Sequence, residues 1–263
     1  MEKIKVILLK EWAEVFKNRT VLYTIMLMPL LFTAIPLGIL YSMRGQEGLT
    51  DLSADVPKQF SGFCPEELSG GECFQVYLVS QFMLMFMFLP LTIPTTIAAF
   101  TIVGEKKNRT LEPLLATPIT TVELLTGKSL ASFIPAVAAT FFAFGLYALG
   151  AWLLIPNPSL FKAIMDTRWL ASIFLVGPLM ALIAISVTMI VSSRVSDPRT
   201  AEQLAMVVII PVLGLFFAQI AGVFVINLRF VLISAVVLAF IAGLLVYLTV
   251  RLFQRETILT RWK

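Results

Sequence analysis

Two cysteines are the side chains of this 263-residue chain with the plainest potential for chemistry. Cys64 and Cys73 close a ring of ten residues within the stretch 44–75, which is rich in Gly, Ser, Pro and acidic residues. On the outer side of a cell such a pair can oxidise, and the bridge would remove about 2.5–3 kcal/mol of chain entropy from the open loop. The alternative is two free thiols, and a metal pair is disfavoured because no histidine completes a site. We predict a structural Cys64–Cys73 disulfide.

Other kinds of chemistry are excluded by missing side chains. The chain has no histidine, which excludes bis-histidine haem, histidine metal sites and Ser/His/Asp hydrolysis. Gly127, Lys128 and Ser129 match the end of the phosphate-binding pattern GxxxxGK[ST], but Val122 occupies the position of its first glycine. We therefore predict no catalytic residue, metal site or cofactor in this chain.

The composition points to lipid as the solvent that these residues must face. Hydrophobic residues make up 59% and charged residues 14% of the chain, with a mean hydropathy of +0.92, against roughly 45–50% and 25% in soluble domains. A membrane helix needs about 20 apolar residues, and a charge at its centre costs at least ~2.5 kcal/mol. Six stretches without Asp, Glu, Lys or Arg meet this need: 21–43, 76–103, 129–155, 170–193, 204–226 and 230–250. We expect one all-α integral membrane domain over residues 1–263.

The distribution of basic residues predicts the orientation, because Lys and Arg are retained on the cytoplasmic side of inserted helices. With the N-terminus inside, only Arg44, Lys58, Lys162, Arg168 and Arg229 of the 20 basic residues lie outside. Both ends of the chain are then cytoplasmic, in a multi-pass protein of the plasma or inner membrane. The net charge of +4 suits anionic lipid headgroups and gives no support to nucleic-acid binding.

Residues 1–20 predict a helix of a different kind, which lies in the membrane interface. Its apolar residues recur at spacings of three and four and face away from its charged residues; they are Ile4, Ile7, Leu8, Trp12, Val15 and Phe16, opposite Lys3, Lys10, Glu14 and Lys17. The alternative is a charged cytoplasmic tail without a structural role.

Prolines inside the spans predict kinks, because each one removes a backbone donor; they are Pro29, Pro36, Pro90, Pro94, Pro135, Pro178 and Pro211. Pro90 and Pro94, with Thr92, Thr95 and Thr96 beside them, form the densest cluster. We expect a bend there that serves gating. The alternative is a kink without such a role, because proline is common in membrane helices generally.

The polar and aromatic residues of the spans leave two interpretations open. Ser and Thr hydroxyls in membrane helices bond to the preceding turn or to a neighbouring helix. Methionine and aromatic residues crowd the second and fifth spans, where they either face lipid or form an adaptable apolar cavity. With no carboxylate in any span and no row of arginines, a proton-driven carrier and a voltage sensor are disfavoured.

The stretch Gly104–Lys128 is the most informative part of the sequence, reading GEKKNRTLEPLLATPITTVELLTGK. It predicts a charged exit from the membrane, a short helix with Leu111, Leu114 and Leu115 on one side, a break at Thr117–Pro118 and an amphipathic turn leading back. Such a segment suits docking against a cytoplasmic protein.

This stretch resembles the first cytoplasmic loop of ABC-2 type transporter permeases, in which a GE(K/R) start is followed by TLE, LL and TP and then by ELL and GK. Residues 192–203, SSRVSDPRTAEQ, look like the second cytoplasmic loop of that family. The six-span layout and the N-terminal amphipathic helix agree. The resemblance implies the ABC-2 permease fold, with Arg109 standing where a glycine often precedes TLE and with a very short outer loop at 227–229.

The resemblance also implies a function and the residues that perform it. In the family, the permease dimerises with a copy or a paralogue, each permease docks an ATP-binding subunit that carries ATP and Mg, and cargo moves outward. The implied main coupling residues are Gly104, Glu105, Thr110, Leu111, Glu112, Leu115, Thr117 and Pro118, and the implied second contact is Asp197, Pro198 and Arg199.

Spans two and five resemble those that line the family's pathway, with Phe82, Met85, Phe86, Thr92, Thr95, Phe216 and Gln219 as candidate residues. We therefore expect a permease subunit of an exporter that is not itself an enzyme. The alternative is a non-transporting membrane scaffold or assembly factor whose basic face recruits a cytoplasmic partner.

Overall fold

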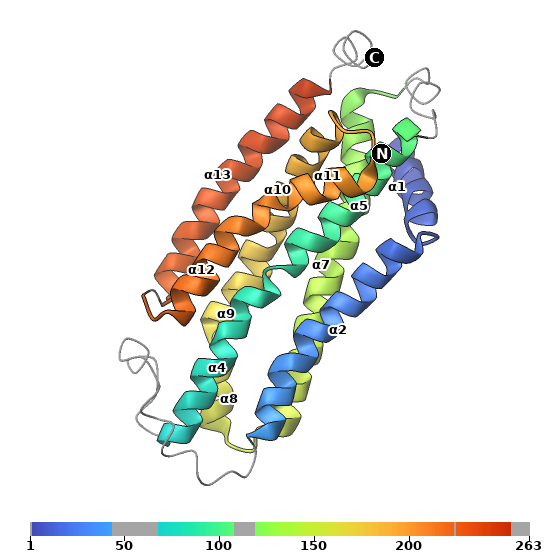
Figure 1. The fold of residues 1–263 in the computed structure, drawn as a ribbon. Helices are drawn as coiled ribbons and strands as arrows, with labels where there is room; N and C mark the ends of the chain where they lie inside the picture. Colours follow the sequence, from blue (N-terminus) through green and yellow to red (C-terminus); the bar gives the residue numbers. More distant parts are fainter. Residues whose placement is uncertain (1, 44–67, 108–118, 224, 254–263) are drawn as a thin grey trace.

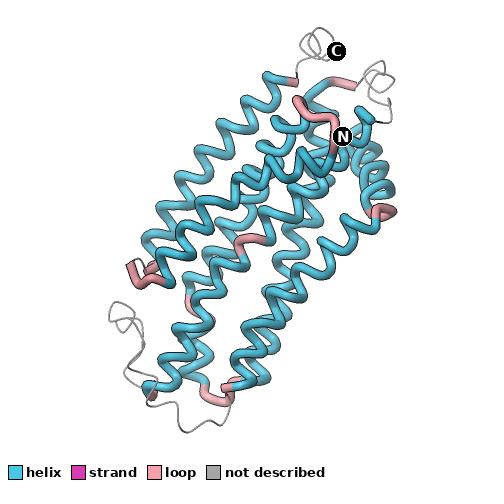
Figure 2. Tube along the Cα trace, viewed as in Figure 1, coloured by secondary structure: helices cyan, strands magenta, loops and turns pink. Residues whose placement is uncertain are grey.

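The computed structural model describes residues 2–43, 68–107, 119–223 and 225–253 (Figure 1). All regular structure within these ranges is helical (Figure 2). Six stretches are long and apolar enough to cross a membrane: Val21–Ser42, Gly70–Glu105, Thr121–Leu154, Pro158–Ser192, Pro198–Ile220 and Leu228–Leu252. The expectation of an all-α protein with six membrane spans is confirmed.

The described helices are the following, of which all but α1 contribute to the spans. They are α1 (Glu2–Val15), α2 (Arg19–Ser42), α4 (Gly70–Phe86), α5 (Leu89–Lys107), α7 (Thr121–Leu154), α8 (Pro158–Ile164), α9 (Thr167–Ala171), the π-helix η2 (Ser172–Val176), α10 (Gly177–Ser192), α11 (Pro198–Ala205), the 3-10 helix η3 (Met206–Ile209), α12 (Ile210–Ile220) and α13 (Leu228–Leu252).

The spans form one elongated bundle with two distinct ends (Figure 1). α10 packs against α5 and α13, while α2 and α1 pack against α7. We call the end that carries α1, the end of α5 and the end of α13 the α1 end, and the opposite end, which carries α8 and the start of α4, the α8 end (Figure 1). The described parts of both predicted cytoplasmic loops belong to the α1 end.

Prolines coincide with three interruptions of the helices. Met87 and Phe88 separate α4 from α5 just before Pro90, the π-helix η2 precedes Pro178, and the 3-10 helix η3 precedes Pro211. Each proline lacks the N–H that would bond the carbonyl four residues earlier, so the preceding turn rearranges. The remaining prolines of the spans, Pro29, Pro36, Pro94 and Pro135, lie inside continuous helices.

The helices reach beyond the predicted spans at most of their ends, and the fifth span is displaced. It begins at Pro198 rather than at residue 204, so it includes Glu202. The expectation that no span carries a carboxylate is wrong, because the second to fourth helical stretches also include acidic residues near their ends: Glu72, Glu105, Glu123 and Asp166. The fifth span ends at Ile220 rather than at 226, because Gly222 adopts a φ of 69°. Bonds from Gly222 N to Gln219 O and from Val223 N to Ala218 O form the Schellman pattern that ends a helix.

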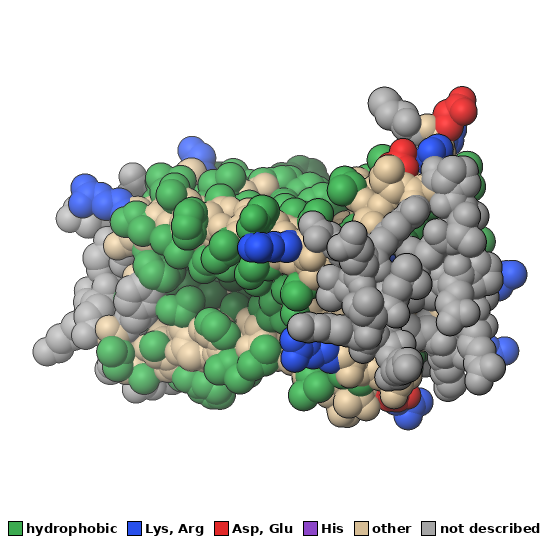
Figure 3. All heavy atoms as spheres, turned by 90° about the horizontal axis from the view of Figure 1, so that it is seen from above, with side chains coloured by type: hydrophobic (Ala, Val, Ile, Leu, Met, Phe, Trp, Pro, Cys, Tyr) green, Lys and Arg blue, Asp and Glu red, His purple; other side chains and the backbone are tan. Residues whose placement is uncertain are grey.

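An aromatic cluster forms the centre of the core. The Trp169 ring stacks on the Tyr147 ring at 5.5 Å and meets the Phe86 ring edge-on at 5.7 Å. These buried rings join α4, α7 and α9. Large apolar side chains such as Val236 and Phe240 are exposed on the outside of the bundle, and apolar side chains cover much of the described surface in Figure 3. This is the surface that lipid covers in a membrane protein.

Candidate functional site

Four charged side chains meet at the α1 end and form what we call the ion cluster: Lys10, Glu11, Glu105 and Lys128. Lys128 Nζ lies 2.8 Å from Glu11 Oε1 and 2.9 Å from Glu105 Oε2. Lys10 Nζ lies 2.6 Å from Glu105 Oε1. The cluster therefore joins three helices, because Glu11 belongs to α1, Glu105 to α5 and Lys128 to α7.

Three members of the ion cluster are almost fully removed from solvent. Glu11, Lys128 and Glu105 are 1%, 2% and 3% exposed, and Lys128 also donates to the carbonyl of Thr101 at 3.0 Å. Burial raises the pKa of the Glu11 carboxyl, which the neighbouring charges of Lys128 and Lys10 only partly oppose. Burial alone would lower the pKa of Lys10, but its hydrogen bond to Glu105 and the surrounding carboxylates raise it.

The sequence identified only part of this cluster. Glu105 was expected to dock a partner, whereas its carboxylate points into the bundle and pairs with Lys128 and Lys10. Glu11 was not singled out, although it shares one face of α1 with Ile7 and Val15, which are both buried. The spacing could have revealed this position, because Glu11 lies four residues after Ile7 and four before Val15, on the same face of the helix.

The ion cluster stands at the base of the predicted coupling segment. Glu105 lies at the start of that segment and Lys128 ends it, so their ion pair brings its two ends together. α7 begins inside it with a capping box, in which the Thr120 side chain accepts from Glu123 N and the Glu123 carboxylate accepts from Thr120 N. Gly104 has open space where a Cβ would stand. The other predicted coupling residues lie outside the described residues: Thr110, Leu111, Glu112, Leu115, Thr117 and Pro118.

The predicted second contact lies at the start of α11. Asp197 caps this helix by accepting a hydrogen bond of 3.0 Å from Thr200 N. Asp197 and Arg199 are exposed, whereas Pro198 is buried. Two of the three residues are thus available on the surface of the described chain.

The second and fifth spans touch along what we call the seam, where α4 and α5 face α11 and α12. Near the α1 end, Thr96 of α5 hydrogen-bonds to the carboxylate of Glu202 on α11. Beside it, Ala201 packs against Ala99 and Val103 of α5, and all three are fully buried. A carboxylate therefore faces the second span from within the fifth.

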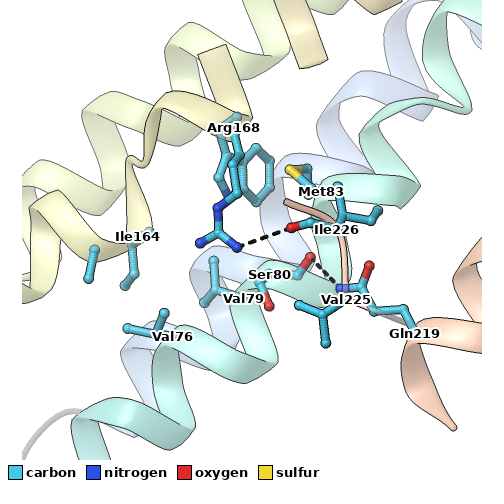
Figure 4. Close-up of a pocket in the computed structure, with 11 residues that line it drawn as sticks. Val76, Val79, Ser80, Met83, Ile164, Arg168, Gln219, Val225 and Ile226 are labelled. Atoms are coloured by element: carbon cyan, nitrogen blue, oxygen red, sulfur yellow. Dashed lines mark hydrogen bonds between the residues drawn. The ribbon is translucent and has the colours of Figure 1, made fainter. Parts of the chain in front are cut away.

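The other polar contact of the seam lies toward the α8 end, in a pocket between α4, α9 and α12 (Figure 4). Gln219 Nε2 donates to Ser80 O at 3.3 Å, and Arg168 Nη1 donates to Ile226 O at 3.2 Å. Arg168 also pairs with Asp166. The pocket has room for about one water molecule, so the seam is closed here.

The predicted pathway residues are divided between the seam and the core. Gln219 lies in the pocket, and the hydroxyls of Thr92 and Thr95 donate to the carbonyls of the preceding turn. Phe86 instead packs in the aromatic core. Three others, Phe82, Met85 and Phe216, are half-buried. The pathway assignment of all seven stays a prediction.

Four polar residues of the seam were not among the predicted pathway residues: Ser80, Thr96, Arg168 and Glu202. Arg168 was assigned to an outer loop and Glu202 to a cytoplasmic loop, because both precede the apolar runs by which spans are recognised. In the structure helices extend through both positions. A charged residue close before an apolar run was the only signal available.

The predicted disulfide is partly outside the described chain. Cys73 is disulfide-bonded, but Cys64 lies outside the described residues. The Cys64–Cys73 pairing stays a prediction.

Comparison with known families finds one match. The family model described as ABC-2 family transporter protein matches residues 72–240. This is well over half of the chain, and it runs from α4 into α13, so it includes the seam, Glu105 and Lys128 but not α1. No individual curated protein matches the chain.

Proposed function

Because the chain belongs to the ABC-2 family of transporter proteins, we propose that it is the permease subunit of an ATP-driven exporter in the plasma or inner membrane. The family match over residues 72–240 carries this proposal. The chain is a multi-pass membrane component of an ABC-type transporter. The direction of transport, the partners and the residues that engage them are the proposed parts.

A separate ATP-binding subunit supplies the energy in this proposal and holds ATP and Mg²⁺. It docks on residues 104–128, with Asp197 and Arg199 as a second contact. The ion cluster supports the first assignment, because it ties both ends of that segment to each other and to α1. A push on the segment then displaces α1, α5 and α7 together, since breaking the pairs would leave buried charges without partners.

Cargo moves outward along the seam between the second and fifth spans, in a dimer of two permeases. Helix interruptions before Pro90 and Pro211 support this path, because one lies in each of the two spans. Such interruptions let the two halves of a span change their relative direction with few broken bonds. The closed pocket at Gln219 corresponds to the state before release.

The test is co-expression with a candidate ATP-binding subunit. We expect the two subunits to purify together, to hydrolyse ATP in a vanadate-sensitive way, and to accumulate cargo in inside-out vesicles only when ATP is present. Glu112→Ala should weaken the association, whereas Glu14→Ala, at a carboxylate 58% exposed on α1, should not.

Three results would each count against the proposal. Isolation without any ATP-hydrolysing partner would remove the energy source, and unchanged association of Glu112→Ala would remove the docking assignment. ATP hydrolysis by the assembled complex without movement of any cargo would favour the scaffold alternative.

A further inference from the structure

The fifth span contains a carboxylate that the proposed transport cycle does not yet use. We infer that Glu202, together with Thr96, binds the positive charge of a cationic and otherwise apolar cargo at the α1 end of the seam. This inference rests on the proposed function, because it assigns a class of cargo to the same pathway.

Glu202 is half-buried, and the hydroxyl that it contacts belongs to a buried residue of α5, Thr96. Its hydrogen-bond partner Thr96 precedes Glu105 by nine residues on α5, which corresponds to about 13 Å along the helix axis at 1.5 Å per residue. Lys106 and Lys107 follow Glu105 and mark the end of the span. The carboxylate therefore contacts α5 about two and a half turns before the charged end of that helix.

Glu202 has no ion-pair partner among the side chains that the structure describes, and Arg199, one turn earlier on α11, is exposed. Glu202 is not needed to begin α11 either, because Asp197 caps that helix. A carboxylate in a membrane span is costly, and residues of this kind mark binding sites or pathways.

The surroundings indicate what kind of cation fits. Thr96 is 1% exposed and donates its hydroxyl hydrogen to the carboxylate, while Ala99, Val103 and Ala201 form an apolar wall beside it. No group of three acidic, histidine or cysteine side chains occurs in the part of the chain that the structure describes, so the ligand set that Ca²⁺ requires is missing here. One carboxylate against an apolar wall suits a singly charged organic cation.

Binding to the permease alone tests this inference without the ATP-binding subunit, so its outcome is independent of whether the complex transports. The probes are tetraphenylphosphonium and tetraphenylborate, which have nearly the same shape and opposite charge. Binding of each to the permease in lipid nanodiscs is measured by equilibrium dialysis, with empty nanodiscs subtracted. We expect saturable binding of tetraphenylphosphonium, weakened at least ~10-fold by Glu202→Gln, with tetraphenylborate binding not reduced.

Further variants separate charge from packing. Glu202→Asp keeps the carboxylate and should retain most of the affinity, whereas Thr96→Val keeps the shape but loses the hydroxyl and should weaken binding. Glu14→Gln removes an exposed carboxylate of α1 and should change nothing. Equal binding of tetraphenylphosphonium to Glu202→Gln and to the unaltered permease overturns the inference, as do the absence of saturable binding and an equal loss for both probes.

Discussion

Lys128 holds two carboxylates at once, and each belongs to a different helix. Its ammonium group donates to Glu11 and to the carbonyl of Thr101, and it also lies 2.9 Å from Glu105 as an ion pair. An arrangement of this kind contributes little net stability over a well-packed apolar substitute, but loss of one member leaves the others buried and unbalanced.

Substitution of Lys128 should therefore be severe. We expect Lys128→Met to lower the free energy of unfolding by about 3–5 kcal/mol, because Glu11 and Glu105 keep their burial and lose their main partner. Denaturant titration of the purified permease in mixed micelles measures the change.

Two matched variants check the cause. Lys3 is 51% exposed and lies 3.9 Å from Glu123, so Lys3→Met should cost less than about 1 kcal/mol. The triple variant Glu11→Gln, Glu105→Gln and Lys128→Met removes all three buried charges and should recover most of the loss. If it is no more stable than Lys128→Met alone, the unbalanced charge is not the cause.

The charged residues also show where reasoning from the sequence stops. The motif that contains Glu105 and Lys128 was recognised, but the direction in which their side chains point was not, because a charge near a span end looks the same whether it faces solvent or the bundle. Glu11 was missed for the same reason, because the charged residues of α1 were expected to lie on one face. Only the packing of α1 against α7 decides which face is buried.

At the level of elements, α1 approaches α7 closely because of one glycine. A Cβ added at Gly127 would lie 2.7 Å from Ile7 Cγ2 and 3.0 Å from Ile7 Cβ, which are not at the flexible end of that side chain. Gly127 therefore sets the distance at which the ion cluster can form between these helices.

A methyl group at this position should push α1 away. We expect Gly127→Ala to cost about 1–3 kcal/mol of unfolding free energy through overpacking. The matched control is Gly145→Ala in the same helix, which meets nothing within 4 Å and should stabilise by about 0.5–1 kcal/mol through helix propensity. In an Ile7→Ala background, Gly127→Ala should cost much less, and full additivity of the two changes would contradict the contact.

The interruption between α4 and α5 gives a second prediction at this scale. Pro90→Ala supplies an N–H for the Phe86 carbonyl and favours one continuous helix through Met87 and Phe88. We expect the variant to assemble normally with the ATP-binding subunit while ATP-driven transport falls several-fold, as measured in inside-out vesicles. Pro29→Ala, within the continuous helix α2, should leave transport unchanged. If both substitutions reduce transport equally, the interruption between α4 and α5 is not what transport requires.

The number and type of elements could be predicted from the sequence, whereas their irregularities could not be fully predicted. Uninterrupted apolar runs gave six spans because charge is so costly in lipid, and Pro90, Pro178 and Pro211 marked the places where the helix changes. Pro94 and Pro135 looked the same and left their helices unbroken. The start of the fifth span was misplaced because α11 is amphipathic and carries Arg199 and Glu202, which resemble a loop in a hydropathy pattern.

For the whole molecule, the predicted orientation is the property on which the direction of transport depends. We expect the α1 end in the cytoplasm and the α8 end outside, with Ser196 and Lys162 exposed at the two ends. In a Cys64→Ser, Cys73→Ser background, a membrane-impermeant maleimide should label Lys162→Cys in intact right-side-out vesicles. It should label Ser196→Cys only after the membrane is permeabilised. The reverse pattern would invert the topology and place the proposed docking segment outside the cell, where the ATP-binding subunit could not reach it.

The ion pair between Glu105 and Lys128 has a consequence for how this protein could diversify. The residues between the two can vary in sequence and in length while both helices remain anchored at the same point. A chimera that receives residues 106–119 of another ABC-2 permease should therefore keep its own bundle and adopt the donor's choice of ATP-binding subunit. The choice of ATP-binding subunit and the architecture of the membrane bundle could then evolve independently in one protein.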